Sequence, residues 1–322
     1  MNAAASSSPL YDVCGLVDFC DRGKIELTGD DRAKFLHNLC TNDIKALAAG
    51  AGCEAMLLDA KGHVQFYVLV HNTGDRLILE ELAPTEEQTG ARLRKHLDKY
   101  LIREKVRITD LTATWGEILV AGDGAVEVVA AALEITPPIE TLGNVRCPVL
   151  GDGAFVTRSV QATAPNFSVF CRIESIAALK ARLVAGGAIA CELADWQAVR
   201  IESRLPLYGV DVTEKNLAQE IDRIDGTISF RKGCYLGQET VARLDALGHV
   251  NKTLVQVTFH SDVPVAIGTE LTVDGKSVGQ VTSTAVLPHG PAVALAYVKR
   301  GNNAIGTKLQ SAAGAATIVR TA

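Results

Sequence analysis

The feature that most limits how this chain can fold is a change of hydrophobic pattern near residues 247–252. Before it, segments with apolar residues three and four positions apart alternate with short runs typical of strands. After about Lys252 no helical periodicity is visible, and short β-rich runs are separated by Gly, Pro and Asp-Gly turns. Closely spaced strands of this kind are typical of a small barrel. The pattern therefore predicts a mixed region over residues 13–248 and a C-terminal β-barrel over residues 249–322.

The mixed region shows the order strand–helix–strand–strand twice. In the first unit a helix follows Asp30-Asp31, which favour a helix N-cap, and two strands flank the turn Ala60-Lys61-Gly62. In the second unit a helix rich in Ala and Val precedes Pro137-Pro138, and two further strands flank Gly151-Asp-Gly153. Two such units predict the α+β class, with two ferredoxin-like (split βαβ) modules packed together. The expected helices span residues 85–100, 125–133, 176–183 and 194–203. The expected barrel strands span residues 255–260, 270–273, 277–284, 292–298 and 308–319.

Composition argues against several classes of protein. The 322 residues carry 32 Lys and Arg against 37 Asp and Glu, a net charge of −5, which argues against binding nucleic acid through a broad basic face. No run of about 18 apolar residues is present, so no membrane span is predicted. The eight cysteines show neither a CxxC motif nor zinc spacing, and the seven histidines are dispersed, so no metal site is predicted.

Cysteine usage and the first residues favour the cytoplasm. Scattered thiols fit reduced cysteines in a cytosol better than a disulfide framework. The first nine residues have neither the basic and apolar regions of a secretory signal nor the arginines of a mitochondrial presequence. We therefore expect a cytoplasmic protein with a short disordered tail at residues 1–12.

Residues 231–240, Arg-Lys-Gly-Cys-Tyr-Leu-Gly-Gln-Glu-Thr, concentrate chemically different side chains in one stretch. The glycines on each side of the Cys-Tyr-Leu core permit backbone conformations that other residues avoid, and they let a ligand or another backbone approach. Positive charge from Arg231 and Lys232 favours the reactive thiolate form of Cys234. A single cysteine fits a buried structural role about as well, so both interpretations of Cys234 stay open.

The string Lys-Gly-Cys-Tyr-x-Gly-Gln-Glu at residues 232–239, followed by Val-Ala-Arg, resembles the signature of the YgfZ-type folate-binding proteins. These proteins are relatives of the glycine-cleavage T-protein (aminomethyltransferase, GcvT-like superfamily) and take part in iron–sulfur cluster assembly or repair. The resemblance implies two ferredoxin-like modules and a terminal barrel around a central channel that binds tetrahydrofolate. It also implies partners among iron–sulfur assembly proteins or client enzymes.

A second stretch, residues 198–211, resembles the T-protein segment in which an arginine, a glutamate and a Gly-x-Asp follow one another. In that family the glutamate hydrogen-bonds the pterin ring, and the matching residues here are Glu202 with Arg200 beside it. A carboxylate suits this role because it accepts two N–H bonds from an aminopyrimidine edge. The other interpretation is an exposed helical Glu202 that pairs with neighbouring arginines.

Further candidate folate-binding residues lie near and within the signature. Arg223 or Arg231 suits the glutamate tail of folate, because the planar guanidinium binds carboxylates through two bonds; a solvated charged loop is the alternative. Lys232 and Gln238 are candidates by their place in the signature. Tyr235 either stacks on the pterin or fills the core.

Two departures from the aminomethyltransferases bear on activity. Their hairpin glycine, corresponding to Gly62, is followed by an acidic pair with an aspartate needed for catalysis, whereas Gln65 and Phe66 stand here. The acidic feature of the strand aligned with residues 166–170 is also missing. Acid–base chemistry needs a titratable group within bonding reach, which Gln65 and Phe66 cannot supply. Cys234, in the signature, is the candidate catalytic residue. The resemblance thus favours a tetrahydrofolate-binding accessory protein over a folate-dependent aminomethyltransferase or a scaffold that has lost its ligand.

Overall fold

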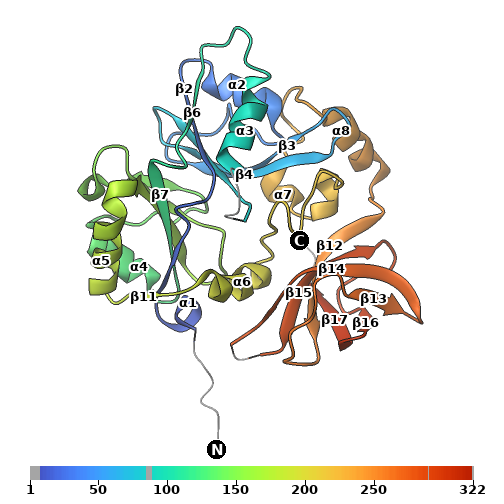
Figure 1. Cartoon of the computed structure of the whole chain (residues 1–322). Coiled ribbons are helices and arrows are strands. Elements are labelled where there is room, and N and C mark those ends of the chain that lie inside the picture. The colour runs from blue at the N-terminus through green and yellow to red at the C-terminus, as the bar shows by residue number, and fades with distance from the viewer. Residues whose placement is uncertain (1–7, 85–88, 289, 321–322) are drawn as a thin grey trace, which may run out of the picture.

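The computed structural model describes residues 8–84, 89–288 and 290–320. Figure 1 shows two α/β modules and a β-barrel as three lobes, with α6 and α7 between them. The predicted α+β class with a closed C-terminal barrel is confirmed. Within the predicted tail, residues 1–7 lie outside the described ranges, whereas Pro9–Asp12 form the short helix α1 with Leu10 buried.

The first module is a 5-stranded antiparallel sheet, order β3-β4-β5-β2-β6, with two helices packed on it. Leu36 and Leu93 are fully buried in its core, because each helix presents its apolar residues on one face. The elements are β2 (Lys24–Thr28), α2 (Arg32–Leu39), β3 (Gly52–Leu58), β4 (Val64–Asn72), β5 (Leu77–Glu81), α3 (Thr89–Asp98) and β6 (Arg107–Asp110).

The second module is a 6-stranded sheet, order β11-β1-β7-β10-β9-β8, with α4 and α5 packed on it. The N-terminal strand β1 lies antiparallel to β7 and parallel to β11, so the modules are interleaved along the chain. The elements are β1 (Gly15–Asp18), β7 (Trp115–Ala121), α4 (Ala125–Leu133), β8 (Asn144–Arg146), β9 (Phe155–Arg158), β10 (Asn166–Arg172), α5 (Ile176–Ala185) and β11 (Ile189–Ala190).

The barrel closes in the order β12-β15-β14-β13-β16-β17, around a core that includes Val257, Leu271 and Ile318. The prediction of a single strand over residues 308–319 is wrong, because two strands pair there. The chain turns at residues 312–313, and Gly314 takes a positive φ of 106°. The elements are β12 (Lys252–Phe259), β13 (Glu270–Val273), β14 (Lys276–Val286), β15 (Ala292–Lys299), β16 (Lys308–Ser311) and β17 (Gly314–Arg320).

The segment before the barrel carries the residues singled out in the sequence. Its elements are α6 (Leu193–Glu202), the 3-10 turn η3 (Ala218–Ile221), α7 (Ile224–Thr227) and α8 (Gln238–Leu247), of which only α6 was predicted. Gly237 has a φ of 84°, and a Cβ there would lie 2.6 Å from the carbonyl oxygen of Asp59. The close backbone approach expected of the signature therefore occurs at Gly237, whereas a Cβ at Gly233 would meet no atom within 4 Å.

Two local expectations differ from the structure for identifiable reasons. Asp31 is the N-cap residue of α2 but makes no side-chain cap, because its Oδ2 accepts from the N–H of Lys105 at 2.8 Å. The strand expected at residues 144–149 ends at Arg146, since Pro148 begins a 3-10 turn.

Of the helix expected at 85–100, residues 85–88 lie outside the described ranges. Across the described residues, no helix has the length and apolar character needed to cross a bilayer.

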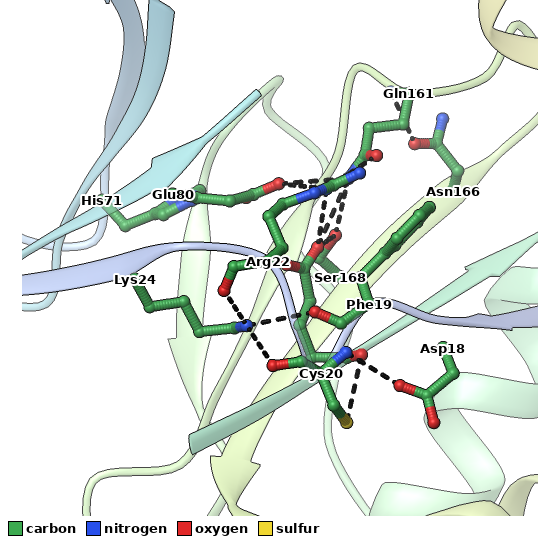
Figure 2. Close-up of polar contacts among 11 residues, drawn as sticks. Asp18, Phe19, Cys20, Arg22, Lys24, His71, Glu80, Gln161, Asn166 and Ser168 are labelled. Carbon is green, nitrogen blue, oxygen red and sulfur yellow. Dashed lines mark hydrogen bonds and ion pairs between the residues drawn. The ribbon is translucent and has the colours of Figure 1, made fainter. Parts of the chain in front are cut away.

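A buried polar cluster joins the two sheets (Figure 2). The Nη1 atom of Arg22 lies 2.6 Å from Oε1 of Glu80 on β5, 3.0 Å from Oε1 of Gln161 and 3.3 Å from Oε1 of Glu117 on β7. The ammonium of Lys24 donates to three backbone carbonyls between residues 19 and 22. Burial, and then the charge of Glu80, raise the pKa of Glu117 to about 7. These charge-assisted hydrogen bonds fix the two modules against each other.

Candidate functional site

Arg223, which precedes α7, is bound by a carboxylate of the first sheet. Its Nη2 lies 2.5 Å from Oε1 of Glu54 on β3, and its Nε lies 2.9 Å from Oε2. The hydroxyl of Tyr67 on β4 lies 3.0 Å from Nε of Arg223 and donates to Glu54. Burial raises the pKa of Tyr67 well above its usual value, so the phenol keeps the proton that it donates. The group is a bidentate ion pair completed by a phenol.

A pocket of about 380 Å³ lies beside this group, lined by Glu54, Arg204 and residues 222–226. The volume falls within the range of small-molecule sites. Arg204 takes a positive φ of 56°, which is uncommon for a residue with a side chain. Its carbonyl oxygen lies 3.4 Å from Nη1 of Arg223. The pocket therefore lies between the first sheet and the segment that follows α6, with both signs of charge in its wall.

Glu202 ends α6, two residues before Arg204. Its Oε2 is buried and makes no close hydrogen bond among the described residues, and the same holds for the hydroxyl of Tyr11 on α1. The two groups lie near each other, because burial, the charge of Glu202 and hydrogen bonding to Glu202 raise the pKa of Tyr11. The alternative of an exposed Glu202 is wrong, because the residue is half-buried. A buried carboxylate oxygen without a donor is costly, so it is a place where an N–H of a ligand would bind.

Arg200 is directed away from Glu202, since helical residues two positions apart do not share a face. Its Nη1 lies 2.9 Å from Oδ2 of Asp211, and its Nη2 lies 2.7 Å from the hydroxyl of Ser283 on β14. Both partners are buried. The structure therefore places Arg200 in an ion pair that ties α6 to the barrel, outside the lining of the Arg223 pocket.

Lys232 anchors the signature to the end of α2. Its Nζ donates to the carbonyl oxygens of His37, Cys40 and Asn42 at 2.5, 2.7 and 2.7 Å. An ammonium has three N–H groups, so these three acceptors engage all of them. Burial lowers the pKa of Lys232, and its Nζ lies 4.7 Å from the centre of the Tyr235 ring.

The remaining signature side chains differ in burial. Tyr235 is buried in the central core, as the core interpretation expects, and Gln238 is the half-buried first residue of α8. Arg231 and Cys234 are exposed. Neither Cys234 nor Glu202 is among the described residues that line the Arg223 pocket. The roles assigned to these residues in folate binding or catalysis stay predictions.

At the positions where aminomethyltransferases carry acidic residues, the side chains of this chain are not acidic and make other contacts. Phe66 on β4 stacks on Tyr208 with ring centres 6.1 Å apart, and the guanidinium of Arg92 lies 4.9 Å from the centre of each ring. Asn166 on β10 donates to two backbone carbonyls of its own loop. Neither position offers a carboxylate.

Sequence reasoning missed Glu54 and Tyr67. A signal was present, because Glu54 is a charged residue in the otherwise apolar strand β3, and a buried charge requires a partner. The sequence does not identify that partner, which lies 169 residues further on at Arg223. In the described part of the chain no group of three His, Cys, Asp or Glu side chains could hold a metal ion.

Comparison with known families bears directly on this site. Residues 5–232 match the family described as the GCVT N-terminal domain, which is more than half of the chain. The chain belongs to the GCVT N-terminal domain family. Membership confirms the GcvT-like part of the resemblance seen in the sequence.

The relatives of this GCVT-family chain include aminomethyltransferases. One from Rippkaea orientalis is 27% identical over 304 residues, covering 92% of this chain and 81% of the relative. One from Staphylococcus haemolyticus is 23% identical over 311 residues, covering 93% and 82%. A chloroplastic protein of Arabidopsis thaliana, provisionally named a transferase, is 28% identical over 309 residues; the match covers 90% of this chain and 66% of that protein. The chain thus spans slightly under two thirds of the length of that relative.

A solved structure shows the same fold. The crystal structure of the glycine cleavage system aminomethyltransferase T from Bartonella henselae matches 97% of this GCVT-family chain and 86% of its own, with a TM-score of 0.85. The sequence identity is 19%, so the likeness establishes the fold alone.

Proposed function

We propose that this GCVT-family chain is a tetrahydrofolate-binding accessory protein of YgfZ type, which acts in iron–sulfur cluster assembly or repair in the cytoplasm. One observation carries the folate part: Glu202, which matches the pterin-binding glutamate of the family, has a buried oxygen that makes no close hydrogen bond among the described residues, with the Tyr11 hydroxyl as a donor nearby. The iron–sulfur part rests on the likeness of residues 231–240 to the YgfZ-type signature and on the exposed thiol of Cys234.

The residues present suit a folate. The aminopyrimidine edge of a pterin carries N–H groups, which Glu202 would accept, and the Tyr11 hydroxyl supplies a further hydrogen-bonding group beside it. Arg231 is exposed and free of the core, which suits the carboxylates of the folate tail. The ion pair with Glu54 would hold Arg223 in place in the wall of the pocket. Tetrahydrofolate, when bound, supplies a carrier for a one-carbon unit.

Glu202→Gln should weaken tetrahydrofolate binding about 10- to 100-fold, because a hydrogen bond to a charged group is worth roughly 1.5–3 kcal/mol and each 1.4 kcal/mol is tenfold. Calorimetric titration of tetrahydrofolate into wild type and variant gives the ratio. Glu127→Gln, at an exposed glutamate of α4, is the matched control and should bind like wild type. The folate proposal fails if wild type binds no tetrahydrofolate, or if Glu202→Gln binds it equally well.

A second candidate function is aminomethyl transfer, which the aminomethyltransferase relatives and the buried carboxylate of Glu54 favour. Both oxygens of Glu54 are engaged by Arg223 and Tyr67, so the group is not a free base. We expect no methylene transfer from an aminomethyl carrier to tetrahydrofolate. Turnover that Glu54→Gln abolishes would replace the accessory function with this one.

Cys234→Ala should abolish the support that this chain gives to an iron–sulfur enzyme, while folding and folate affinity stay unchanged. The reason is that the thiol is exposed, so its loss removes reactivity but little packing. The measurement is the activity of that enzyme in cells lacking the native protein and supplied with wild type or variant. Cys191→Ala, at a half-buried thiol, is the control that should behave like wild type. Full activity of Cys234→Ala would refute the assigned role.

A further inference from the structure

Two buried carboxylates at the contact between the α/β modules share the same donors. Glu80 on β5 belongs to the first sheet and Glu117 on β7 to the second, and both side chains are fully buried. Oε1 of Glu80 lies 2.6 Å and Oε1 of Glu117 lies 3.3 Å from one atom, Nη1 of Arg22. The amide Nε2 of Gln161 lies 3.3 Å from the first of these oxygens and 3.4 Å from the second. Two negative charges held this close together repel each other, so a proton on one of them is favoured.

Glu117 is the less well compensated member of the pair. Both oxygens of Glu80 are engaged, because its Oε2 lies 3.3 Å from Nε2 of His71 on β4. Oε1 of Glu117 accepts from the hydroxyl of Ser168 on β10 at 3.0 Å, but its Oε2 is buried and has no hydrogen-bond partner among the described residues. A buried carboxylate oxygen without a donor disfavours the charged form. Glu117 is therefore the carboxyl that holds the proton.

The charged groups that face Glu117 are two cations and one carboxylate. Arg22 comes from the β1–β2 connection, Lys24 from β2 and Glu80 from β5. The ammonium of Lys24 donates to three backbone carbonyls. The imidazole of His71 reaches the cluster from β4, where it contacts Glu80. The cations favour the ionised form of Glu117, whereas burial and Glu80 oppose it.

The balance of these effects makes Glu117 titrate near neutral pH. Burial and the charge of Glu80 raise the pKa of Glu117 from the usual 4.5 to about 7. The folded chain therefore holds a proton that the unfolded chain releases between these two values. The stabilisation from this proton is complete below about pH 4.5, and it is lost as the pH rises through about 7.

We propose that Glu80 and Glu117 form a proton-controlled latch between the two modules. With a proton on Glu117, the guanidinium of Arg22 and the amide of Gln161 hold both sheets while only Glu80 is charged. When this proton passes to water, two carboxylates face each other across the contact. The contact between the sheets then opens more often, because opening lets water reach Oε2 of Glu117. The proposed folate function uses none of these residues.

Urea unfolding of wild type and Glu117→Gln between pH 5 and pH 9 tests the proton. Glutamine does not ionise, so the ratio of the two unfolding constants isolates Glu117 from the other titrating groups. We expect this ratio, wild type over variant, to rise about tenfold for each pH unit from 5 to 7 and then to level off. Glu127→Gln, at an exposed glutamate of α4, is the matched control, and its ratio should stay flat. A flat ratio for Glu117→Gln overturns the proposal.

The carboxyl ¹³C signal of Glu117 reports its titration directly and does not depend on whether Glu117→Gln folds. We expect a midpoint near pH 7 in wild type. Ser168→Ala should move the midpoint to higher pH, because the ionised oxygen loses a donor. Glu80→Gln should move it to lower pH, because the neighbouring negative charge is removed. A wild-type midpoint below pH 5 contradicts the latch.

Hydrogen exchange distinguishes a latch from an acid that is merely buried. After correction for the intrinsic rate, the amides of β5 and β7 in wild type should exchange several-fold faster at pH 8.5 than at pH 6. Glu117→Gln should show no such increase, and the barrel strands β12 and β15 serve as the internal reference in both proteins. Equal protection of β5 and β7 at the two pH values in wild type refutes the latch, even if Glu117 titrates near pH 7.

Discussion

Arg200→Met should lower the free energy of unfolding by about 3–5 kcal/mol, because it leaves a buried carboxylate without its counter-ion. Arg200 Nη1 lies 2.9 Å from Oδ2 of Asp211, and the two side chains are 2% and 0% exposed. Methionine fills much of the volume but cannot balance the charge of Asp211. The hydrogen bond from Arg200 to Ser283 is lost as well, so the barrel is held less firmly on α6. Urea unfolding followed by tryptophan fluorescence measures the loss.

A double variant separates charge from packing at this position. Arg200→Met with Asp211→Asn should recover a large part of the stability, because a neutral amide costs less to bury than an unpaired carboxylate. The amide oxygen can still accept from the backbone N–H of Leu207, which the carboxylate binds at 3.0 Å. Arg243→Met, at an exposed arginine, is the control and should stay within about 0.5 kcal/mol of wild type. If the double variant is no more stable than Arg200→Met, the charge argument is wrong.

Lys232→Met should cost about 2–3 kcal/mol, since hydrogen bonds to a charged group are worth roughly 1.5–3 kcal/mol and the freed carbonyls are only partly rehydrated. Three carbonyl oxygens at the end of α2 would lose their shared donor. The loop from residue 231 to 237 would then be released from the first module. The same urea experiment gives the loss, and Arg231→Met at the exposed neighbour should change little.

The Lys232 variant also distinguishes a structural lysine from a folate contact. With its three N–H groups engaged by the backbone, Lys232 should contribute little to ligand binding. Tetrahydrofolate affinity should therefore be unchanged in Lys232→Met at a temperature where the variant is fully folded. A tenfold weaker affinity under those conditions would instead establish Lys232 as a folate contact.

Periodicity was enough to predict most of the fold. The apolar spacing of Phe35, Leu36 and Leu39 identifies α2, and the loss of helical spacing after Lys252 identifies the barrel. Periodicity could not predict the elements whose formation depends on partners far away in the sequence. β11 is two residues long and exists only because it pairs with β1, and α8 begins directly after Gly237, whose backbone lies against that of Asp59.

The site was predicted less well, for a physical reason. Residue type shows that Arg200, Arg223 and Lys232 are cations, but it does not show which acceptor each one meets. Lys232 meets backbone carbonyls, which carry no residue-type signal at all. Arg223 meets Glu54 across 169 positions, and only the folded sheet brings the two together. The family resemblance supplied Glu202, the residue whose unpaired oxygen the structure then revealed.

The placement of β1 constrains how this protein can be made. Residues 15–18 leave the ribosome early, yet their neighbours in the sheet, Val120 and Ile189, are synthesised about a hundred and more residues later. Until then the nascent chain holds an unpaired apolar strand, while the first module can already close around β2 to β6. A fragment starting after β1 would leave the second sheet with a gap between β7 and β11. The second module therefore cannot be excised as a continuous piece of the polypeptide, whereas the first module is one unbroken segment from β2 to β6.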